Sequence, residues 1–263
     1  SAPGSIFKAV TMAAALANWP DALDRTFTCT GAYQVGETII TDAGNARHGE
    51  ITLQKALAVS CNITFAKLAL ELGDEQLRLA AQAFGLDDHL LFSDLVVENS
   101  LYPSSNRVAK ELAWTGPGQS ALFVTPMHMC LVAAGIANDG VIMEPKLLIQ
   151  SVDRNKQGKA QMTPTVYKKA MTPQHADVLA EAMRQVVVSG TGTRAAVPGL
   201  KICGKTGSAQ IDGQTSTNAW FIGFIDEKTL PYAVCVVVND AGEGSRHAAP
   251  LARQIFEYIK NQR

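Results

Sequence analysis

Apolar residues recur every three or four positions through most of the first two-thirds of the chain. This spacing places them on one face of an α-helix. Each stretch begins at or near Ser, Thr, Asn, Asp or Pro, and several end at Gly or Asn, which are favoured at helix starts and ends. The pattern predicts helices over residues 6–18, 52–59, 62–72, 74–85, 125–138 and 173–188.

The end of the chain changes to short apolar runs rich in β-branched and aromatic residues, separated by Gly, Asp and Pro turns. These runs predict neighbouring antiparallel strands over 200–207, 217–225 and 232–238. A last stretch, 249–260, returns to helical spacing and should cover one face of the sheet. Because no repeat, low-complexity tract or linker interrupts the sequence, we expect one unit of mixed helix and sheet.

The composition is that of a folded protein without a strong charge preference. The chain has 263 residues, of which 47% are hydrophobic, enough for a sizeable core, so disordered and fibrous classes are excluded. Lys and Arg number 23 against 24 Asp and Glu, and they are scattered, so a nucleic-acid partner is not expected. The longest apolar run, 232–238, has the length of a strand rather than of a membrane span.

The five cysteines, at positions 29, 61, 130, 203 and 235, are widely dispersed. They form no C-x-x-C pair and no Cys/His group at metal-ligand spacing, so neither a structural zinc nor a disulfide framework is expected. The sequence predicts no cofactor.

One short motif is misleading. Residues 199–206 read GLKICGKT and satisfy the phosphate-loop pattern G-x-x-x-x-G-K-[ST]. A phosphate loop must follow a buried strand and open a helix, yet here a proline precedes the pattern and its middle residues resemble a strand. Nucleotide binding is therefore not predicted.

Ser5 and Lys8 form an S-x-x-K motif at the start of the first helix. Residues three apart share one helix face, so the amine can lie against the hydroxyl and act as its base. A lysine becomes such a base when burial keeps it neutral. Gly4 would allow close backbone approach beside Ser5, although a capping serine with a solvated lysine is the simpler alternative.

Ser60 and Asn62 form an S-x-N motif between two predicted helices, where both side chains can point out of one turn. The simpler alternative makes Ser60 the N-cap of the 62–72 helix. The same pattern occurs at 104–106, in a polar loop, and at 216–218, at a strand start, where turn and strand-start functions suffice.

A third motif, Lys205-Thr206-Gly207-Ser208, lies on the first late strand. Lys205 supplies positive charge, the two hydroxyls can bind a carboxylate, and Gly207 would let a substrate backbone approach the strand. A strand ending in a glycine turn is the simpler alternative for this motif alone.

Together, S-x-x-K, S-x-N and K-[TS]-G in this order resemble the signature of penicillin-binding proteins and serine β-lactamases. Residues 115–148, 189–210, 218–225 and 248–259 sharpen the likeness, which extends over nearly the whole chain. They resemble the transpeptidase domain of class B, monofunctional penicillin-binding proteins of the elongation and sporulation type. The resemblance implies an α+β fold, an antiparallel sheet flanked by helices in an α/β sandwich, plus an all-helical subdomain.

The resemblance also implies a serine D,D-transpeptidase acting on peptidoglycan stem peptides. Ser5 would attack the carbonyl of the penultimate D-alanine while Lys8 accepts its proton. Ser60 would relay a proton to the departing D-alanine, and Asn62 would hold Lys8 and the substrate amide. The backbone amides of Ser5 and Ser208 would form the oxyanion hole.

The same likeness makes Lys205, Thr206, Gly207 and Ser208 the binding site for the terminal carboxylate of the substrate, or for that of a β-lactam. Family members usually have Thr where this chain has Ser208, which keeps the hydroxyl and the amide. Cys61 fits the variable middle position of the second motif.

Family members also carry strands upstream of the S-x-x-K helix, an N-terminal dimerisation or pedestal region and a membrane anchor. This chain opens on SAPGS without an initiator Met. We therefore expect residues 1–263 to be the catalytic domain of a longer protein, with one edge of strand 232–238 unpaired. The resemblance implies a location on the extracytoplasmic face of the bacterial membrane and a membrane glycosyltransferase as partner.

Three alternatives remain. A D,D-carboxypeptidase differs only in using water as the acceptor. A serine β-lactamase would need a carboxylate to activate water, and Glu98 does not stand in the expected E-x-x-x-N pattern. A β-lactam sensor shares the three motifs but should lack the GPGQSALFVTP segment.

Overall fold

The computed structural model describes residues 1–103, 108–155, 158–210 and 216–262. Its central feature is a three-stranded antiparallel sheet in the order β11-β10-β9. In the register, Gly207 of β9 faces Trp220 of β10, and Trp220 faces Val237 of β11. The strands are β9 (Ile202–Gln210), β10 (Thr217–Ile225) and β11 (Ala233–Val238), each overlapping a predicted strand.

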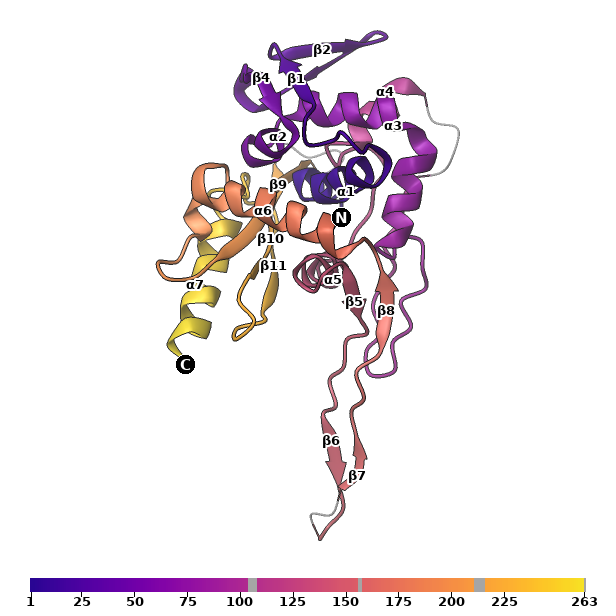
Figure 1. Ribbon diagram of the computed structural model, residues 1–263, viewed down its shortest axis with the longest axis vertical. Coiled ribbons are helices and arrows are strands. Elements are labelled where there is room, and N and C mark those ends of the chain that lie inside the picture. The colour runs from indigo at the N-terminus through magenta and orange to yellow at the C-terminus, as the bar shows by residue number, and fades with distance from the viewer. Residues whose placement is uncertain (104–107, 156–157, 211–215, 263) are drawn as a thin grey trace.

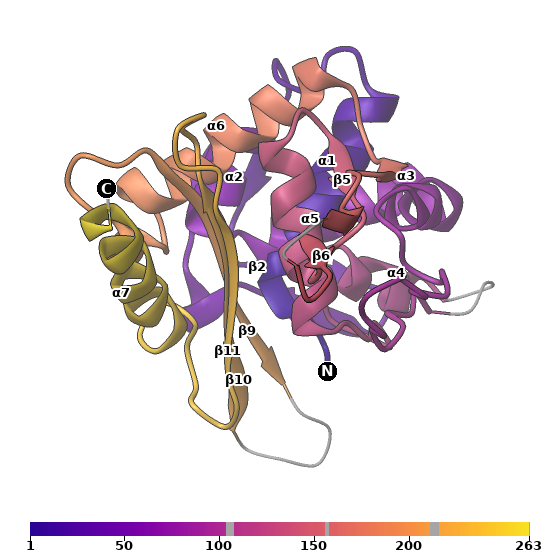
Figure 2. The same cartoon turned by 90° about the horizontal axis from the view of Figure 1, so that it is seen from below.

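Helices cover both faces of this sheet. Figure 2 shows α7 (Ala248–Asn261) on one face and the remaining helices on the other. Alternate residues of β10 divide between two cores: Trp220 packs with the main helical side, whereas Phe221 packs with Phe256 of α7. This alternation explains why the strand reads as a continuous apolar run.

The helix predicted over 249–260 is α7, and the other predicted helices are all present on the larger side of the sheet. A short 3₁₀ turn, η1 (Gly4–Phe7), leads into the buried helix α1 (Lys8–Asn18), which packs against α3 (Figure 1). The predicted helices 62–72 and 74–85 form one element, α3 (Asn62–Ala83), interrupted at Gly73 with its φ of 79°. The others are α2 (Leu53–Val59), α4 (Ala109–Thr115), which was not predicted, α5 (Pro126–Ala137) and α6 (Pro173–Ser189).

Four short antiparallel strand pairs were not predicted either. One of them, β6 with β7, forms the extended arm at the bottom of Figure 1. The pairs are β1 (Thr26–Cys29) with β4 (Gly49–Thr52), β2 (Ala32–Val35) with β3 (Thr38–Thr41), β5 (Val141–Met143) with β8 (Val166–Lys169), and β6 (Gln150–Val152) with β7 (Gly158–Gln161). Two further 3₁₀ turns are η2 (Ala43–Asn45) and η3 (Thr193–Ala195).

The α+β architecture is therefore as predicted. Within the described part of the chain, β11 pairs only with β10, so it is an edge strand, as the family resemblance led us to expect. None of the described helices combines the length and hydrophobicity needed to cross a bilayer.

Candidate active site

Ser5 and Lys8 lie side by side where η1 passes into α1. Lys8 Nζ is 3.1 Å from Ser5 Oγ, so the predicted proximity of hydroxyl and amine is present. Lys8 has no exposed surface, which contradicts the alternative of a solvated lysine. The structure thus places an amine within hydrogen-bonding distance of a serine hydroxyl in a buried environment.

Lys8 Nζ also contacts the S-x-N motif. It donates to the carbonyl oxygen of Ser60 at 2.6 Å and to Asn62 Oδ1 at 2.7 Å, and it lies 3.1 Å from Ser60 Oγ. The carbonyl and amide oxygens can only accept, so they use both N–H groups of a neutral lysine. Its lone pair is then left for the hydroxyls of Ser5 and Ser60.

The neutral form of Lys8 is accessible near physiological pH. Burial lowers the pKa of Lys8 to about 7, against the opposing charge of Asp42. A lysine at that value is suited to accept a proton from a serine hydroxyl.

The S-x-N turn has an unusual backbone. Ser60 ends α2 in a left-handed conformation with φ of 60° and ψ of 39°. The N-cap of α3 is Cys61, whose sulfur accepts from the backbone amide of Thr64, so the alternative of Ser60 as N-cap is wrong. Asn62 Nδ2 donates to the carbonyl oxygen of Thr41 at 3.0 Å, which turns Oδ1 toward Lys8.

Lys205 approaches the same turn from β9. Its Nζ lies 2.9 Å from Ser60 Oγ, so the hydroxyl of Ser60 connects two buried lysines. Burial and the neighbouring Lys8 lower the pKa of Lys205 well below its usual value. Because two adjacent buried cations repel each other, the pair Lys8 and Lys205 holds one proton more readily than two.

The two hydroxyls of the third motif have partners that the sequence did not indicate. Thr206 Oγ1 lies 2.5 Å from the hydroxyl oxygen of Thr191, and Ser208 Oγ accepts from the amide of Gly244 at 3.2 Å. Thr191 stands in the segment 189–210, whose resemblance to the family was the available signal. Gly244 had no signal in the sequence, because a lone glycine in a polar loop has no specific pattern.

Gly207 has close neighbours from another segment of the chain. A Cβ at this position would lie 3.0 Å from the carbonyl oxygen of Pro3 and from Ile6 Cγ2. The strand is therefore approached here by the protein's own η1 turn, a contact that the sequence did not indicate. The absence of a side chain lets Ser5 lie close to β9.

Gly4 shows the close backbone approach that was predicted. Its φ is +56°, and a Cβ there would lie 2.6 Å from the carbonyl oxygen of Ser208. On the other side of the turn, a Cβ on Gly118 would lie 1.9 Å from the carbonyl oxygen of Gly4. Three backbone segments are thus packed together around the turn that carries Ser5.

The misleading motifs are resolved in part. Lys205 lies inside β9 rather than before a helix, so the phosphate-loop pattern has no phosphate-loop structure. The S-x-N pattern at 216–218 begins β10, where Ser216 donates to Asp240, as expected for a strand start. The pattern at 104–106 falls outside the described residues. Glu98 is exposed.

Comparison with known proteins assigns the class. Residues 1–257 match the family described as the penicillin binding protein transpeptidase domain, and the chain belongs to this family. The curated relatives include proteins of the class B kind that was predicted. They include the peptidoglycan D,D-transpeptidase PbpA of Mycolicibacterium smegmatis, 33% identical over 95% of this chain and 53% of its own length. Another is the stage V sporulation protein D of Bacillus subtilis, 30% identical over 97% of this chain and 41% of its own.

Solved structures give the same result. The D,D-transpeptidase domain of a peptidoglycan glycosyltransferase from Eggerthella lenta has a TM-score of 0.90 and 31% identity, over all of this chain and 66% of that one. Penicillin-binding protein A of M. tuberculosis, as a ceftriaxone acyl-enzyme, has a TM-score of 0.88 and 29% identity, over 98% of this chain and 60% of that one. The chain spans about half the length of the PbpA relatives it matches.

Proposed function

We propose that residues 1–263 form the catalytic domain of a serine D,D-transpeptidase that cross-links peptidoglycan stem peptides through an acyl-enzyme on Ser5. One observation carries the proposal: two serine hydroxyls lie 3.1 Å from the nitrogen of a buried lysine whose N–H groups already have acceptors. The names of the PbpA relatives and the β-lactam acyl-enzymes of penicillin-binding protein A support the same chemistry.

Acylation begins at Ser5. Its hydroxyl attacks the carbonyl carbon of the penultimate D-alanine, and Lys8 accepts the proton through its lone pair. Ser60 Oγ, which lies 3.1 Å from the same nitrogen, relays that proton to the amine of the departing D-alanine. The product is an ester between Ser5 and the stem peptide, which the amine of a second stem peptide then attacks.

Lys205 binds the terminal carboxylate of the substrate, with the hydroxyls of Thr206 and Ser208. Ser208 Oγ accepts from Gly244, so its own proton remains to be donated to an anion. A carboxylate beside Lys205 favours the protonated form of that lysine. The bound substrate therefore draws the shared proton to Lys205 and leaves Lys8 neutral for catalysis.

The backbone amides of Ser5 and Ser208 form the oxyanion hole in this proposal. Each such donor contributes about 3 kcal/mol to transition-state binding in other serine hydrolases. The close packing of Gly4 on the carbonyl of Ser208 supports the assignment, because it brings the two residues from distant parts of the chain together.

The wider setting is also proposed by analogy with the family. The domain works outside the cytoplasmic membrane as part of a longer, membrane-anchored protein with upstream strands and an N-terminal pedestal. Its partner is a membrane glycosyltransferase that supplies the glycan strands. β-Lactams acylate Ser5 as substrate mimics.

Fluorescent penicillin tests the nucleophile directly. The protein is incubated with the reagent, and its intact mass and the labelled peptide are determined. We expect one adduct per chain, on Ser5, that persists for many minutes, and no adduct with Ser5→Ala. A matched control is Ser189→Ala, a serine whose hydroxyl donates to the carbonyl oxygen of Gln185 in its own helix, which should be labelled normally. Labelling at another residue would remove Ser5 from the mechanism.

The fate of the acyl group separates the alternatives. A stem pentapeptide with a D-amino acid acceptor should give the exchanged peptide in excess of the hydrolysed one. Hydrolysis alone would make the protein a D,D-carboxypeptidase, and release of the penicillin adduct within seconds would make it a β-lactamase. Among the described residues no carboxylate forms a hydrogen bond with Ser5 or Lys8, which favours slow release.

A further inference from the structure

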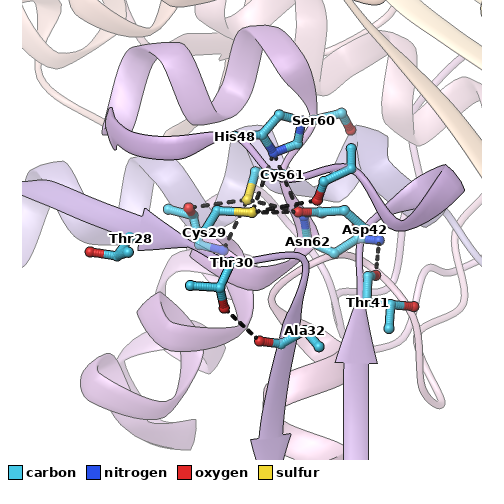
Figure 3. A network of polar contacts seen from close by, with 12 residues as sticks. Thr28, Cys29, Thr30, Ala32, Thr41, Asp42, His48, Ser60, Cys61 and Asn62 are labelled. Carbon is cyan, nitrogen blue, oxygen red and sulfur yellow. Dashed lines mark hydrogen bonds and ion pairs between the residues drawn. The ribbon is translucent and has the colours of Figure 1, made fainter.

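Four side chains with metal-binding atoms meet directly behind the S-x-N turn. They come from four separate segments: Cys29 ends β1, Asp42 precedes η2, His48 precedes β4, and Cys61 caps α3 (Figure 3). One ligand atom from each lies within 4.8 Å of the other three. The two cysteines and Asp42 are buried, whereas His48 is partly exposed.

The distances resemble the edges of a coordination tetrahedron. Zinc bonds of about 2.0–2.3 Å place tetrahedral ligands roughly 3.3–3.8 Å apart. Cys29 Sγ lies 3.5 Å from His48 Nδ1, which lies 3.3 Å from Asp42 Oδ2. The sulfurs of Cys29 and Cys61 lie 3.0 and 3.2 Å from the same oxygen of Asp42. Shifts of a few tenths of an ångström along most edges would accommodate an ion at the centre.

Hydrogen bonds alone satisfy this cluster poorly. The two thiols and the imidazole all point at Oδ2 of Asp42, although a carboxylate oxygen has only about two acceptor positions. Asp42 is also a buried carboxylate that has no lysine or arginine ion pair among the described residues, and such a charge needs a positive partner. A divalent cation would supply the charge and replace the crowded protons.

Neighbouring groups are arranged as an outer shell for bound ligands. The backbone amide of Asn62 donates to the other oxygen of Asp42, and both the amide and the hydroxyl of Thr64 donate to Cys61 Sγ. Donors of this kind fix the orientation of metal ligands. Two thiolates, an imidazole and a carboxylate form a donor set that suits zinc better than magnesium or calcium.

We propose that Cys29, Asp42, His48 and Cys61 bind one Zn²⁺ ion, which fixes the turn that carries Ser60 and Asn62. Zn²⁺ takes the place of the two thiol protons, which pass to solvent, and neutral His48 binds through Nδ1. This conclusion departs from the expectation of no structural zinc, which rested on the wide spacing of the cysteines in the sequence.

The consequence for catalysis rests on the proposed function. Cys61 lies between Ser60 and Asn62 and would bind the metal directly, while Asp42 would connect the metal to the amide of Asn62. The zinc ligands are therefore positioning residues: they hold the two side chains that contact Lys8, and they do not touch the substrate.

Metal content and spectroscopy test the site without reference to activity. The purified protein is reduced, stripped with a chelator and titrated with Co²⁺ and then with Zn²⁺. We expect one metal per chain, a thiolate-to-cobalt charge-transfer band with intense tetrahedral d–d bands, and their loss when Zn²⁺ displaces Co²⁺. Failure to bind near one equivalent, or a weak octahedral spectrum, would overturn the proposal.

Variants locate the ion. Cys61→Ser and Cys29→Ser should abolish the charge-transfer band or weaken it strongly, and Cys130→Ser, which alters a free thiol elsewhere, should leave it unchanged. His48→Ala changes a partly exposed residue and leaves the buried ligands unchanged, so it tests the site if the cysteine variants do not fold. It should weaken zinc binding by more than the ~10–100-fold typical of a lost outer-shell partner. An unchanged spectrum in these variants would contradict the site, as would a mass 2 Da lower on purification, which indicates a Cys29–Cys61 disulfide.

Acylation provides a second, separate readout. Stripping the metal should slow labelling by fluorescent penicillin and zinc should restore it, with a parallel rise in melting temperature. If zinc binds but does not change the rate of labelling, the metal site is supported and the positioning role of its ligands is rejected. Absence of labelling both with and without zinc would reject the proposed function and leave the metal site standing.

Discussion

The side chain of Asn62 connects Lys8 to the backbone of Thr41. Its Oδ1 accepts from Lys8 Nζ at 2.7 Å, and its Nδ2 donates to the Thr41 carbonyl oxygen at 3.0 Å. The second bond fixes which end of the amide faces Lys8. Asn62 therefore determines how Lys8 is oriented relative to Ser5, although it makes no hydrogen bond with the serine.

The first prediction follows from this connection. Asn62→Ala removes an acceptor from Lys8, so the lone pair is no longer directed at the hydroxyl of Ser5. We expect the second-order rate of acylation by penicillin to fall by ~10–100-fold, less than the ~10²–10⁴-fold cost of losing the base itself in Lys8→Arg. Stopped-flow or gel-based labelling measures both rates.

A matched control separates this effect from general damage. Asn18→Ala removes an asparagine whose side chain donates to the carbonyl oxygen of Ala14 within its own helix, and it should acylate at the normal rate. Equal rates for Asn62→Ala and the unmodified protein would show that Asn62 does not orient Lys8.

The second prediction concerns pH. Because burial lowers the pKa of Lys8 to about 7, the amine is protonated below that pH and cannot accept the proton of Ser5. The acylation rate should therefore rise about tenfold per pH unit up to roughly pH 7 and then level off. A rate constant measured from pH 5 to 9 checks this, and a rate still rising steeply above pH 9 would indicate a lysine of ordinary pKa.

The third prediction uses two glycines with nearly the same positive φ. Gly4 has φ of +56° and Gly36 has φ of +59°, so alanine costs about 1 kcal/mol of backbone strain at either position. A Cβ at Gly36 meets nothing within 4 Å, whereas a Cβ at Gly4 would lie 2.6 Å from the carbonyl oxygen of Ser208. Gly4→Ala should displace the turn that carries Ser5.

We therefore expect Gly36→Ala to acylate normally with a slightly lower melting temperature, and Gly4→Ala to lose acylation by at least ~100-fold. Labelling and thermal unfolding of both variants provide the comparison. Similar acylation in the two would mean that η1 adapts to the added methyl group, and that the contact with Ser208 does not position Ser5.

The fourth prediction concerns the sheet edge. β10 has a neighbour on both sides, whereas β11 pairs only with β10 in the described chain. Backbone amides of β11 that point away from β10 should exchange with deuterium much faster than amides of β10. Residue-resolved hydrogen exchange on dilute protein checks this, and equal protection of both strands would show that another strand, from this chain or from a second one, covers the edge.

The sequence predicted the elements that local patterns determine. The helix carrying Lys8 and the three long strands have the spacing of apolar residues that marks their type, and they are bounded by capping or turn residues. The three motifs predicted the cluster of Ser5, Lys8, Ser60 and Lys205, because their order and flanking segments are specific to a family. The structure shows the distances that this prediction needed.

What the sequence missed depends on contacts between distant segments. The strands β1 and β4 have only four residues each, and their pairing depends on a partner that no local pattern identifies. The approach of Cys29 to Cys61 results from that pairing, so spacing along the chain could not indicate it. The contact of Gly207 with the η1 turn was missed for the same reason: a missing side chain indicates close approach but not what approaches.

The glycine contacts around Ser5 also bear on how this domain can change under antibiotic selection. A Cβ added at Gly4 or Gly118 would first meet main-chain atoms rather than the end of a flexible side chain. If Ser5 is the nucleophile, as proposed, a mutation at either glycine would move it relative to the stem peptide and to the drug alike. Under the proposed function, variants that escape β-lactams and keep their activity should therefore arise at side chains near the site, such as Thr191, and seldom at these glycines.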